Sequence, residues 1–314
     1  MKTTGQGSFV FVHNEDLRTV PESALSVEIN LHGGFAVDKR PSEGAAYYGM
    51  PGRGLIRVSP DLSQQQVIDI PDDLRPLNFH STKIGLFDGK TSLFLPANED
   101  AKVAILTLDG DLQYVFNTPE FDEYRKEGVA FNPTDTALIG DTLYVADGYG
   151  ANYISTADLE DRAWTGLFGG KTEDATELGK YETAHGLNLT PDQQSIAIAD
   201  RPLARIQISS PTGSVAVSHG LPEGSWPCGI DFTQIGGEWF AVVGSLEHPD
   251  KSRPAPIYIL DAAYNVVSTL RPKEDLGIDR ADHLHNVVWH EHGAHTFLLC
   301  QSWNPGYYFV LQME

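Results

Sequence analysis

Three histidines stand at matching places along the sequence and could bind one metal ion together. They are His80, His185 and His285, separated by 105 and 100 residues. Imidazole nitrogens suit zinc, copper, nickel and iron better than magnesium or calcium. Three protein ligands with a fourth position left open are typical of catalytic rather than structural zinc sites. A single histidine could simply pack in a core, but three at matching intervals favour a shared site.

The intervals have structural meaning because the chain repeats itself about every fifty residues. The clearest copy begins at Thr183-Ala184-His185, turns at Thr190-Pro191-Asp192, and continues through two further apolar segments, 195–200 and 204–208. Comparable entry positions are found throughout the chain, at His32, His80, Thr134, His185, Cys228 and His285. The steps between them are 48, 54, 51, 43 and 57 residues. A repeat of this length is typical of β-propeller blades with variable outer loops.

We therefore predict an all-β fold, a six-bladed β-propeller with a central metal channel. Residues 1–314 are expected to form one domain, because no Pro/Gly/Ser-rich linker separates the repeats. The first strand of each blade lines the channel, so histidines from blades 2, 4 and 6 should converge on the axis. The apolar segment 9–12 should pair with the last blade and close the ring, which removes an exposed sheet edge. Residues 119–126 are expected to form one short helix in a loop.

Composition and charge exclude several classes of partner. The formal net charge of −21 disfavours nucleic acid, whose binding requires a basic surface, and also disfavours anionic lipid. No apolar run approaches the ~20 residues that cross a bilayer, and no apolar leader is visible at the N-terminus. We expect a cytoplasmic protein, or a secreted or periplasmic one that has lost a leader. Cys228 and Cys300 are expected to be buried free thiols rather than a disulfide.

Two segments resemble the propeller enzyme peptidyl-α-hydroxyglycine α-amidating lyase, which is built from NHL-type repeats. One runs from Pro133-Thr134-Asp135 to Asp147-Gly148-Tyr149-Gly150, and the other from His185 through Ala199-Asp200-Arg201 to Ile208. The resemblance implies Tyr149 as a catalytic base, Arg201 as an active-site arginine, and His80, His185 and His285 as zinc ligands.

The chain departs from this family at three positions. His32 replaces an arginine that grips the substrate carboxylate, His283 replaces a methionine, and Asn286 replaces an aspartate associated with calcium. The resemblance therefore implies fold and metal site more strongly than substrate. His32 and His283 become candidates for orienting the substrate, and His283 is also a candidate fourth ligand, proton donor or lid.

Each candidate residue has a simpler structural explanation. Asp147-Gly148-Tyr149-Gly150 is a typical turn sequence, and Arg201 could pair with an aspartate of an adjacent blade. Cys228 could bind zinc, but its apolar neighbours favour an inert buried thiol. Lys83 could reach the channel from the strand of His80, but a lone lysine is usually solvated. Three further histidines are expected to be exposed in a hairpin: His290, His292 and His295.

The sequence as a whole favours a metal-dependent enzyme, most simply a zinc lyase acting on a small polar or hydroxylated substrate. A cation would be needed to lower the pKa of the Tyr149 phenol from its usual value near ~10 before it could act as a base. One alternative is a propeller hydrolase or lactonase, which typically holds a calcium-like metal with carboxylates; no glutamate occupies an entry position here. The other is a non-catalytic NHL-type binding propeller. Substrate, metal and oligomeric state stay open at this stage.

Overall fold

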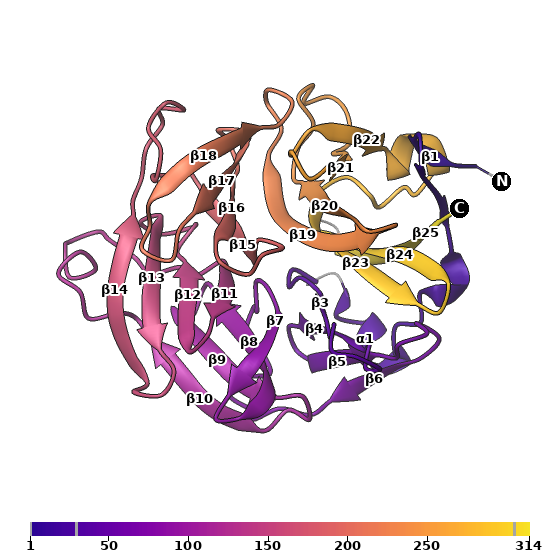
Figure 1. The fold of residues 1–314 in the computed structure, drawn as a ribbon. Coiled ribbons are helices and arrows are strands. Elements are labelled where there is room, and N and C mark those ends of the chain that lie inside the picture. Colours follow the sequence, from indigo (N-terminus) through magenta and orange to yellow (C-terminus); the bar gives the residue numbers. More distant parts are fainter. Residues whose placement is uncertain (1, 29–30, 304–305) are drawn as a thin grey trace.

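Six antiparallel sheets stand around a common centre, so the protein is an all-β, six-bladed propeller (Figure 1). The computed structural model describes residues 2–28, 31–303 and 306–314. Each sheet grows from short apolar segments separated by turn residues, which is the pattern that specifies strands joined by hairpins. Strand order follows the chain within each of the first five blades, so neighbouring strands there pair with the shortest connections.

The first three blades each contain four strands, and the innermost strand comes first in the sequence. Blade 1 contains β3 (Ala36–Val37), β4 (Ala46–Met50), β5 (Gly54–Val58) and β6 (Gln65–Ile68). Blade 2 contains β7 (Lys83–Phe87), β8 (Lys90–Ala97), β9 (Lys102–Thr107) and β10 (Leu112–Asn117). Blade 3 contains β11 (Asp135–Ile139), β12 (Thr142–Ala146), β13 (Tyr153–Asp158) and β14 (Ala163–Gly169).

The remaining blades keep this plan, with one addition at the end of the ring. Blade 4 contains β15 (Ala184–Leu189), β16 (Ile196–Asp200), β17 (Arg205–Ser209) and β18 (Val215–Gly220). Blade 5 contains β19 (Pro227–Ile235), β20 (Glu238–Ser245), β21 (Ile257–Leu260) and β22 (Val266–Leu270). Blade 6 contains β23 (Leu284–His292), β24 (His295–Ser302), β25 (Tyr307–Met313), β2 (Phe9–His13) and β1 (Thr4–Gln6).

The N-terminal segment closes the ring, as the sequence predicts. Strand β2 pairs antiparallel with β25, with Phe11 opposite Met313 and His13 opposite Leu311. The two ends of the chain therefore lie on the same blade (Figure 1). Phe11 is fully buried and packs near Trp289 in the core that blade 6 shares with blade 5. Closure thus joins backbone pairing to burial of a large side chain.

The core lies between the blades. Middle strands such as β16 and the inner part of β8 are buried on both faces, because each sheet is covered by a neighbour on either side. This explains why their sequences are apolar runs rather than strict alternations. One such interface packs Tyr144 and Ile154 of blade 3 against Leu187 and Ile198 of blade 4.

The helical elements in the part of the chain that the structure describes are short, and they include η1 (Glu15–Leu17), α1 (Glu22–Leu25) and the π-helical turn η3 (Pro272–Leu276). The helix expected at residues 119–126 is absent, and that prediction was wrong: the segment forms turns, one of which is closed by Tyr124 N donating to Phe121 O. Tyr124 is buried against Phe131 in the core, so packing rather than helix propagation fixes the segment. No helix among the described residues is long and apolar enough to cross a membrane.

Candidate metal centre

The predicted histidines meet at the centre of the ring. His80 lies just before β7, while His185 and His285 are the second residues of β15 and β23. Their ring centroids are 4.7 Å apart for His80–His185, 4.7 Å for His80–His285 and 4.9 Å for His185–His285. All three are at least 97% buried. Alternate blades therefore do present three imidazoles to one place, as the spacing predicts.

Backbone carbonyls determine which nitrogen of two of these rings carries the proton. His80 Nδ1 lies 2.7 Å from Thr134 O, and His185 Nδ1 lies 2.5 Å from Cys228 O. A carbonyl oxygen only accepts, so each Nδ1 is the donor and each Nε2 carries the lone pair. The two Nε2 atoms are 3.2 Å apart and cannot hydrogen-bond to each other as neutral rings. Both Nε2 atoms are therefore placed where they could bind one cation.

His285 has more unused bonding capacity still. Neither Nδ1 nor Nε2 has a hydrogen-bond partner among the described residues, although the ring is 97% buried. Buried polar groups without partners are rare in native proteins, because each one loses its bonds to water. The pKa of all three imidazoles lies well below the usual 6.5, chiefly because burial disfavours the charged form. Neutral imidazoles are the form that binds metals.

A fourth imidazole, that of His32, joins the cluster. It lies before β3, and its ring centroid is 4.5 Å from both His80 and His285. One ligand atom each from His32, His80 and His285 lie within 4.8 Å of one another. Burial lowers the pKa of His32 to about 4, so this ring is also neutral.

Tyr149 reaches the cluster from the turn after β12, which the side chain of Asp147 organises. Asp147 accepts hydrogen bonds from the backbone nitrogens of Asn132 and Ala151 at 2.6 and 2.7 Å. Gly148 allows a close approach to blade 4, because a Cβ there would lie 2.2 Å from Ala184 O. Tyr149 is 37% exposed, yet its hydroxyl lies 3.1 Å from His185 Nε2. The Tyr149 ring is thus partly open to solvent, while its hydroxyl contacts the histidine cluster.

Arg201 is held against that hydroxyl. It follows β16, is 4% exposed, and donates from Nη1 to the Tyr149 hydroxyl at 2.8 Å and from Nη2 to Cys228 Sγ at 3.2 Å. The carboxylate partner from an adjacent blade that the sequence left open is not found among the described residues. Burial raises the pKa of Tyr149, and Arg201 only partly opposes this. Arg201 alone therefore does not make the phenol a base near neutral pH.

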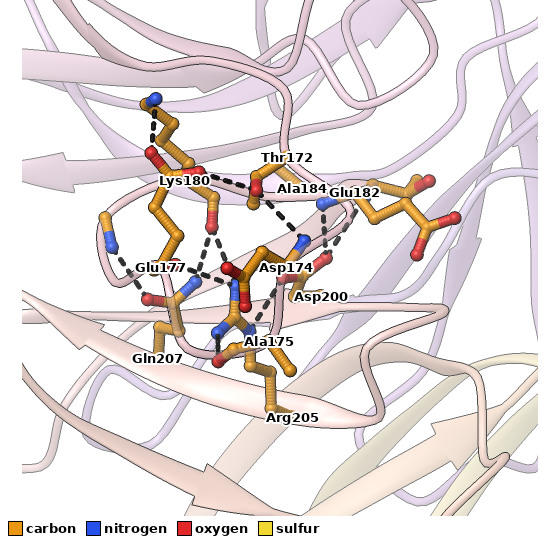
Figure 2. A network of polar contacts seen from close by, with 12 residues as sticks. Thr172, Asp174, Ala175, Glu177, Lys180, Glu182, Ala184, Asp200, Arg205 and Gln207 are labelled. Atoms are coloured by element: carbon orange, nitrogen blue, oxygen red, sulfur yellow. Dashed lines mark hydrogen bonds and ion pairs between the residues drawn. The ribbon is translucent and has the colours of Figure 1, made fainter.

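A buried ion pair fixes the segment that leads into His185 (Figure 2). Arg205 Nε lies 2.9 Å from Asp200 Oδ2, and the two side chains are 4% and 0% exposed. Asp200 also accepts from the backbone nitrogens of Glu182 and Thr183. Figure 2 shows the other arms of Arg205 directed at carbonyls of the same segment, those of Ala175, Glu177 and Lys180. Because Asp200 precedes Arg201, this network positions both blade 4 functional residues.

His283 stays at the edge of the cluster. It is partly buried, its Nδ1 has no partner among the described residues, and its ring centroid is 6.3 Å from Trp303. Trp303, 38% exposed, also lies 5.4 Å from His32. Trp303 and Tyr149 thus contact the cluster from blades 6 and 3 with their rings partly open to solvent.

A pocket of about 710 Å³ extends from the histidines along the first strands of the blades. Ion pairs line it that sequence reasoning missed, since their partners come from different blades: Lys39 Nζ is 2.8 Å from Asp231 Oδ1, and Lys83 Nζ is 3.0 Å from Asp135 Oδ2. Lys83 is therefore paired rather than simply solvated. The Asn286 side chain accepts a hydrogen bond from Phe35 N at 3.0 Å.

Two predictions about other sulfur and imidazole groups had different outcomes. Cys228 and Cys300 are free and buried, as predicted. His292 and His295 are exposed in the β23–β24 hairpin, but the prediction for His290 was wrong. His290 is 1% exposed, and its Nε2 lies 2.7 Å from Pro60 O. The loop after β5 covers this face of the hairpin, which sequence spacing does not reveal.

Comparison with known proteins supports the fold and leaves the family open. No family model and no curated protein matches the sequence. A streptogramin B lyase structure matches with a TM-score of 0.59 at 12% identity, covering 97% of this chain and 98% of that one. Virginiamycin B lyase from Staphylococcus aureus gives 0.53 at 12% identity, covering 87% and 78%. Hydrazine synthase of Kuenenia stuttgartiensis gives 0.50 at 15% identity over 70% of this chain, which spans only 55% of that one. At these identities the likeness shows the propeller fold alone.

Proposed function

We propose that this protein is a metal-dependent lyase whose ion, zinc or another transition metal, is held by His80, His185 and His285. The observation that carries the proposal is the pair of Nε2 lone pairs, 3.2 Å apart, whose orientation two backbone carbonyls fix. Hydrogen bonds from the second ring nitrogen to backbone carbonyls are the usual support of metal-bound histidines. The unpartnered nitrogens of His285 complete a set of imidazoles that fits a transition ion.

A bound ion of this kind would act as a Lewis acid that polarises a substrate hydroxyl or carbonyl oxygen. Tyr149 is the group placed to move a proton, because its hydroxyl contacts both His185 and Arg201. Arg201 holds the phenol oxygen in place and stabilises negative charge on it. With no carboxylate partner among the described residues, its guanidinium can also orient an anionic or polar substrate group.

These roles suit the cleavage of a carbon–nitrogen or carbon–oxygen bond at a carbon that also carries a hydroxyl. Removing the hydroxyl proton lets that oxygen form a carbonyl as the neighbouring bond breaks, and the same proton goes to the departing nitrogen or oxygen. Tyr149 would carry the proton between the two atoms. Two structural neighbours, streptogramin B lyase and virginiamycin B lyase, are lyases by name, which is consistent with this reaction class on the same fold.

Metal analysis of the freshly purified protein tests the proposal. We expect about one transition ion per chain, lost in His185→Ala and kept in Tyr149→Phe. A matched control is His219→Ala in the outer strand β18. This variant removes a partly exposed imidazole that stacks on the ring of Tyr264. If wild-type protein binds no transition ion, even after incubation with zinc or cobalt, the lyase proposal fails and a binding propeller remains. Near-normal turnover in Tyr149→Phe would remove Tyr149 from the mechanism.

A further inference from the structure

We infer that His32 is a fourth metal ligand, so that four imidazoles rather than three surround the ion. This inference rests on the proposed metal centre and deepens it. Its first support is position: the His32 ring is 92% buried, and its centroid is 4.5 Å from two of the proposed ligands, His80 and His285. Those distances are shorter than any between the three histidines assigned from the repeat.

The second support is the way His32 is held. Its Nδ1 lies 3.2 Å from Oδ1 and 3.0 Å from Nδ2 of Asn78, and Asn78 Nδ2 lies 3.3 Å from Glu99 Oε1. When one proton of the Asn78 amide nitrogen goes to the Glu99 carboxylate, Oδ1 can accept from His32 Nδ1, whereas donation of the second amide proton would make His32 Nδ1 the acceptor. In the first arrangement His32 Nε2 keeps its lone pair, the state that the carbonyls impose on His80 and His185, and this is the arrangement that a bound metal ion requires. A carboxylate that acts through a second group on an imidazole is the support expected of a metal ligand.

The third support is coverage by Trp303, whose ring lies 5.4 Å from that of His32 with an angle of 33° between the planes. Trp303 is itself 38% exposed, so it separates the outer face of His32 from solvent. The imidazole is thus fixed at Nδ1 by Asn78 and on one face by Trp303, while its ligand atom joins those of His80 and His285.

This assignment changes the expected chemistry. A fourth imidazole fills the position that a three-histidine site leaves for water or substrate. Substrate must then displace His32, or His32 must stay bound while the ion accepts a further ligand. In either case His32 acts on the metal. It does not bind a substrate carboxylate, as the arginine at this blade position does in the amidating lyase.

The test measures metal affinity and ligand count separately from turnover. Zinc affinity is measured by competition with a chromophoric chelator, and the visible absorption of the cobalt(II)-loaded protein is recorded. For His32→Ala we expect the dissociation constant for zinc to rise about tenfold or more, and the cobalt spectrum to shift and return when free imidazole is added. His219→Ala should leave both readouts unchanged.

A second variant keeps the inference testable if His32→Ala fails to fold. Glu99→Gln preserves size at an exposed position and removes the carboxylate that orients Asn78. We expect a smaller, severalfold loss of zinc affinity in Glu99→Gln. If His32→Ala leaves the zinc affinity and the cobalt spectrum unchanged, the assignment is wrong and the three-histidine centre remains. The same result in Glu99→Gln decides the question where His32→Ala does not fold. Absence of metal binding by the wild-type protein would instead overturn the proposed function itself.

Discussion

At the scale of single residues, the site depends on contacts between a ring nitrogen and a backbone carbonyl of the next blade. His185 gains its orientation from Cys228 O, which also lies close to Gly186. A Cβ at position 186 would lie only 2.3 Å from that oxygen. Glycine at 186 therefore lets the two blades approach closely enough for the hydrogen bond to form.

Gly186→Ala should consequently weaken both folding and metal binding. The added methyl group must push Cys228 O away, so we expect a loss of about 1–3 kcal/mol in the free energy of unfolding. Zinc affinity should fall as well, because the His185 ring loses its anchor. The control is Gly229→Ala, where an added Cβ meets nothing within 4 Å. Urea unfolding and chelator competition measure the two effects, and equal behaviour of the two variants would refute this account of Gly186.

Asp147 gives a pH-dependent prediction at the same scale. Burial raises its pKa to about 6 from the usual 3.8, although backbone hydrogen bonds from Asn132 and Ala151 oppose the change. Between these two values the folded protein keeps a proton that the unfolded chain releases. The contribution of Asp147 to stability is therefore most favourable below about pH 4 and declines as the pH rises to about 6.

We expect this decline to amount to about 3 kcal/mol, because a tenfold difference in proton affinity between the folded and unfolded states corresponds to about 1.4 kcal/mol. Asp147→Asn abolishes the titration, so the difference in unfolding free energy between wild type and variant should change by that amount between pH 4 and pH 7. Chemical denaturation across this range measures it. Parallel pH profiles for the two proteins would show that Asp147 titrates normally in the folded state.

At the scale of secondary structure elements, the segment before β15 is held by a buried ion pair as well as by the apolar packing of Tyr181. Arg205 and Asp200 form a buried pair whose remaining hydrogen bonds all go to that segment, as Figure 2 shows. A buried pair contributes little net energy when both partners are present. Removing one partner leaves an uncompensated charge or unpaired carbonyls.

Arg205→Met should therefore destabilise the protein by about 3–5 kcal/mol and disorder the approach to His185. The comparison variant is Arg253→Met, which breaks a more exposed pair with Glu274 and should cost no more than about 1 kcal/mol. Thermal and urea unfolding measure both variants. If Arg205→Met lowers the free energy of unfolding as little as Arg253→Met does, the ion-pair network does not hold the segment before β15 in place.

The same scale shows what the sequence can and cannot predict. The repeat places His80, His185 and His285 in equivalent blade positions. One short entry segment per blade is enough to determine where each residue lies within its blade. Ring closure by β2 also follows from a local apolar pattern. The contact of His32 with Asn78 and the pairing of Lys39 with Asp231 join parts of the chain far apart in sequence, and no local pattern records them. His290 was misplaced for the same reason, because a loop of blade 1 buries it.

At the scale of the whole molecule, the net charge of −21 is the dominant electrostatic feature. Carboxylates spread around a ring repel one another more in the folded state than in the expanded chain, so the charge opposes folding at low ionic strength. Salt shortens the range of this repulsion, from about 30 Å at 0.01 M to about 8 Å at 0.15 M. The exposed ion pairs of the surface weaken at the same time, but each contributes at most about 1 kcal/mol.

We therefore expect the melting temperature of the metal-free protein to rise by several degrees between 0.01 M and 0.5 M sodium chloride. Metal-free protein is the form to use, because a bound ion would add its own stabilisation. A sucrose control separates charge screening from a general effect of an excluded solute. Sucrose strengthens folding through exclusion from the protein surface, so its effect should be equal at both salt concentrations. Chloride and fluoride should give similar curves if screening is responsible. A melting temperature that falls with salt would mean that attractive pairs such as Lys39–Asp231 and Lys83–Asp135 outweigh the overall repulsion. The ion pairs that line the pocket, rather than the net charge, would then govern the stability of the ring.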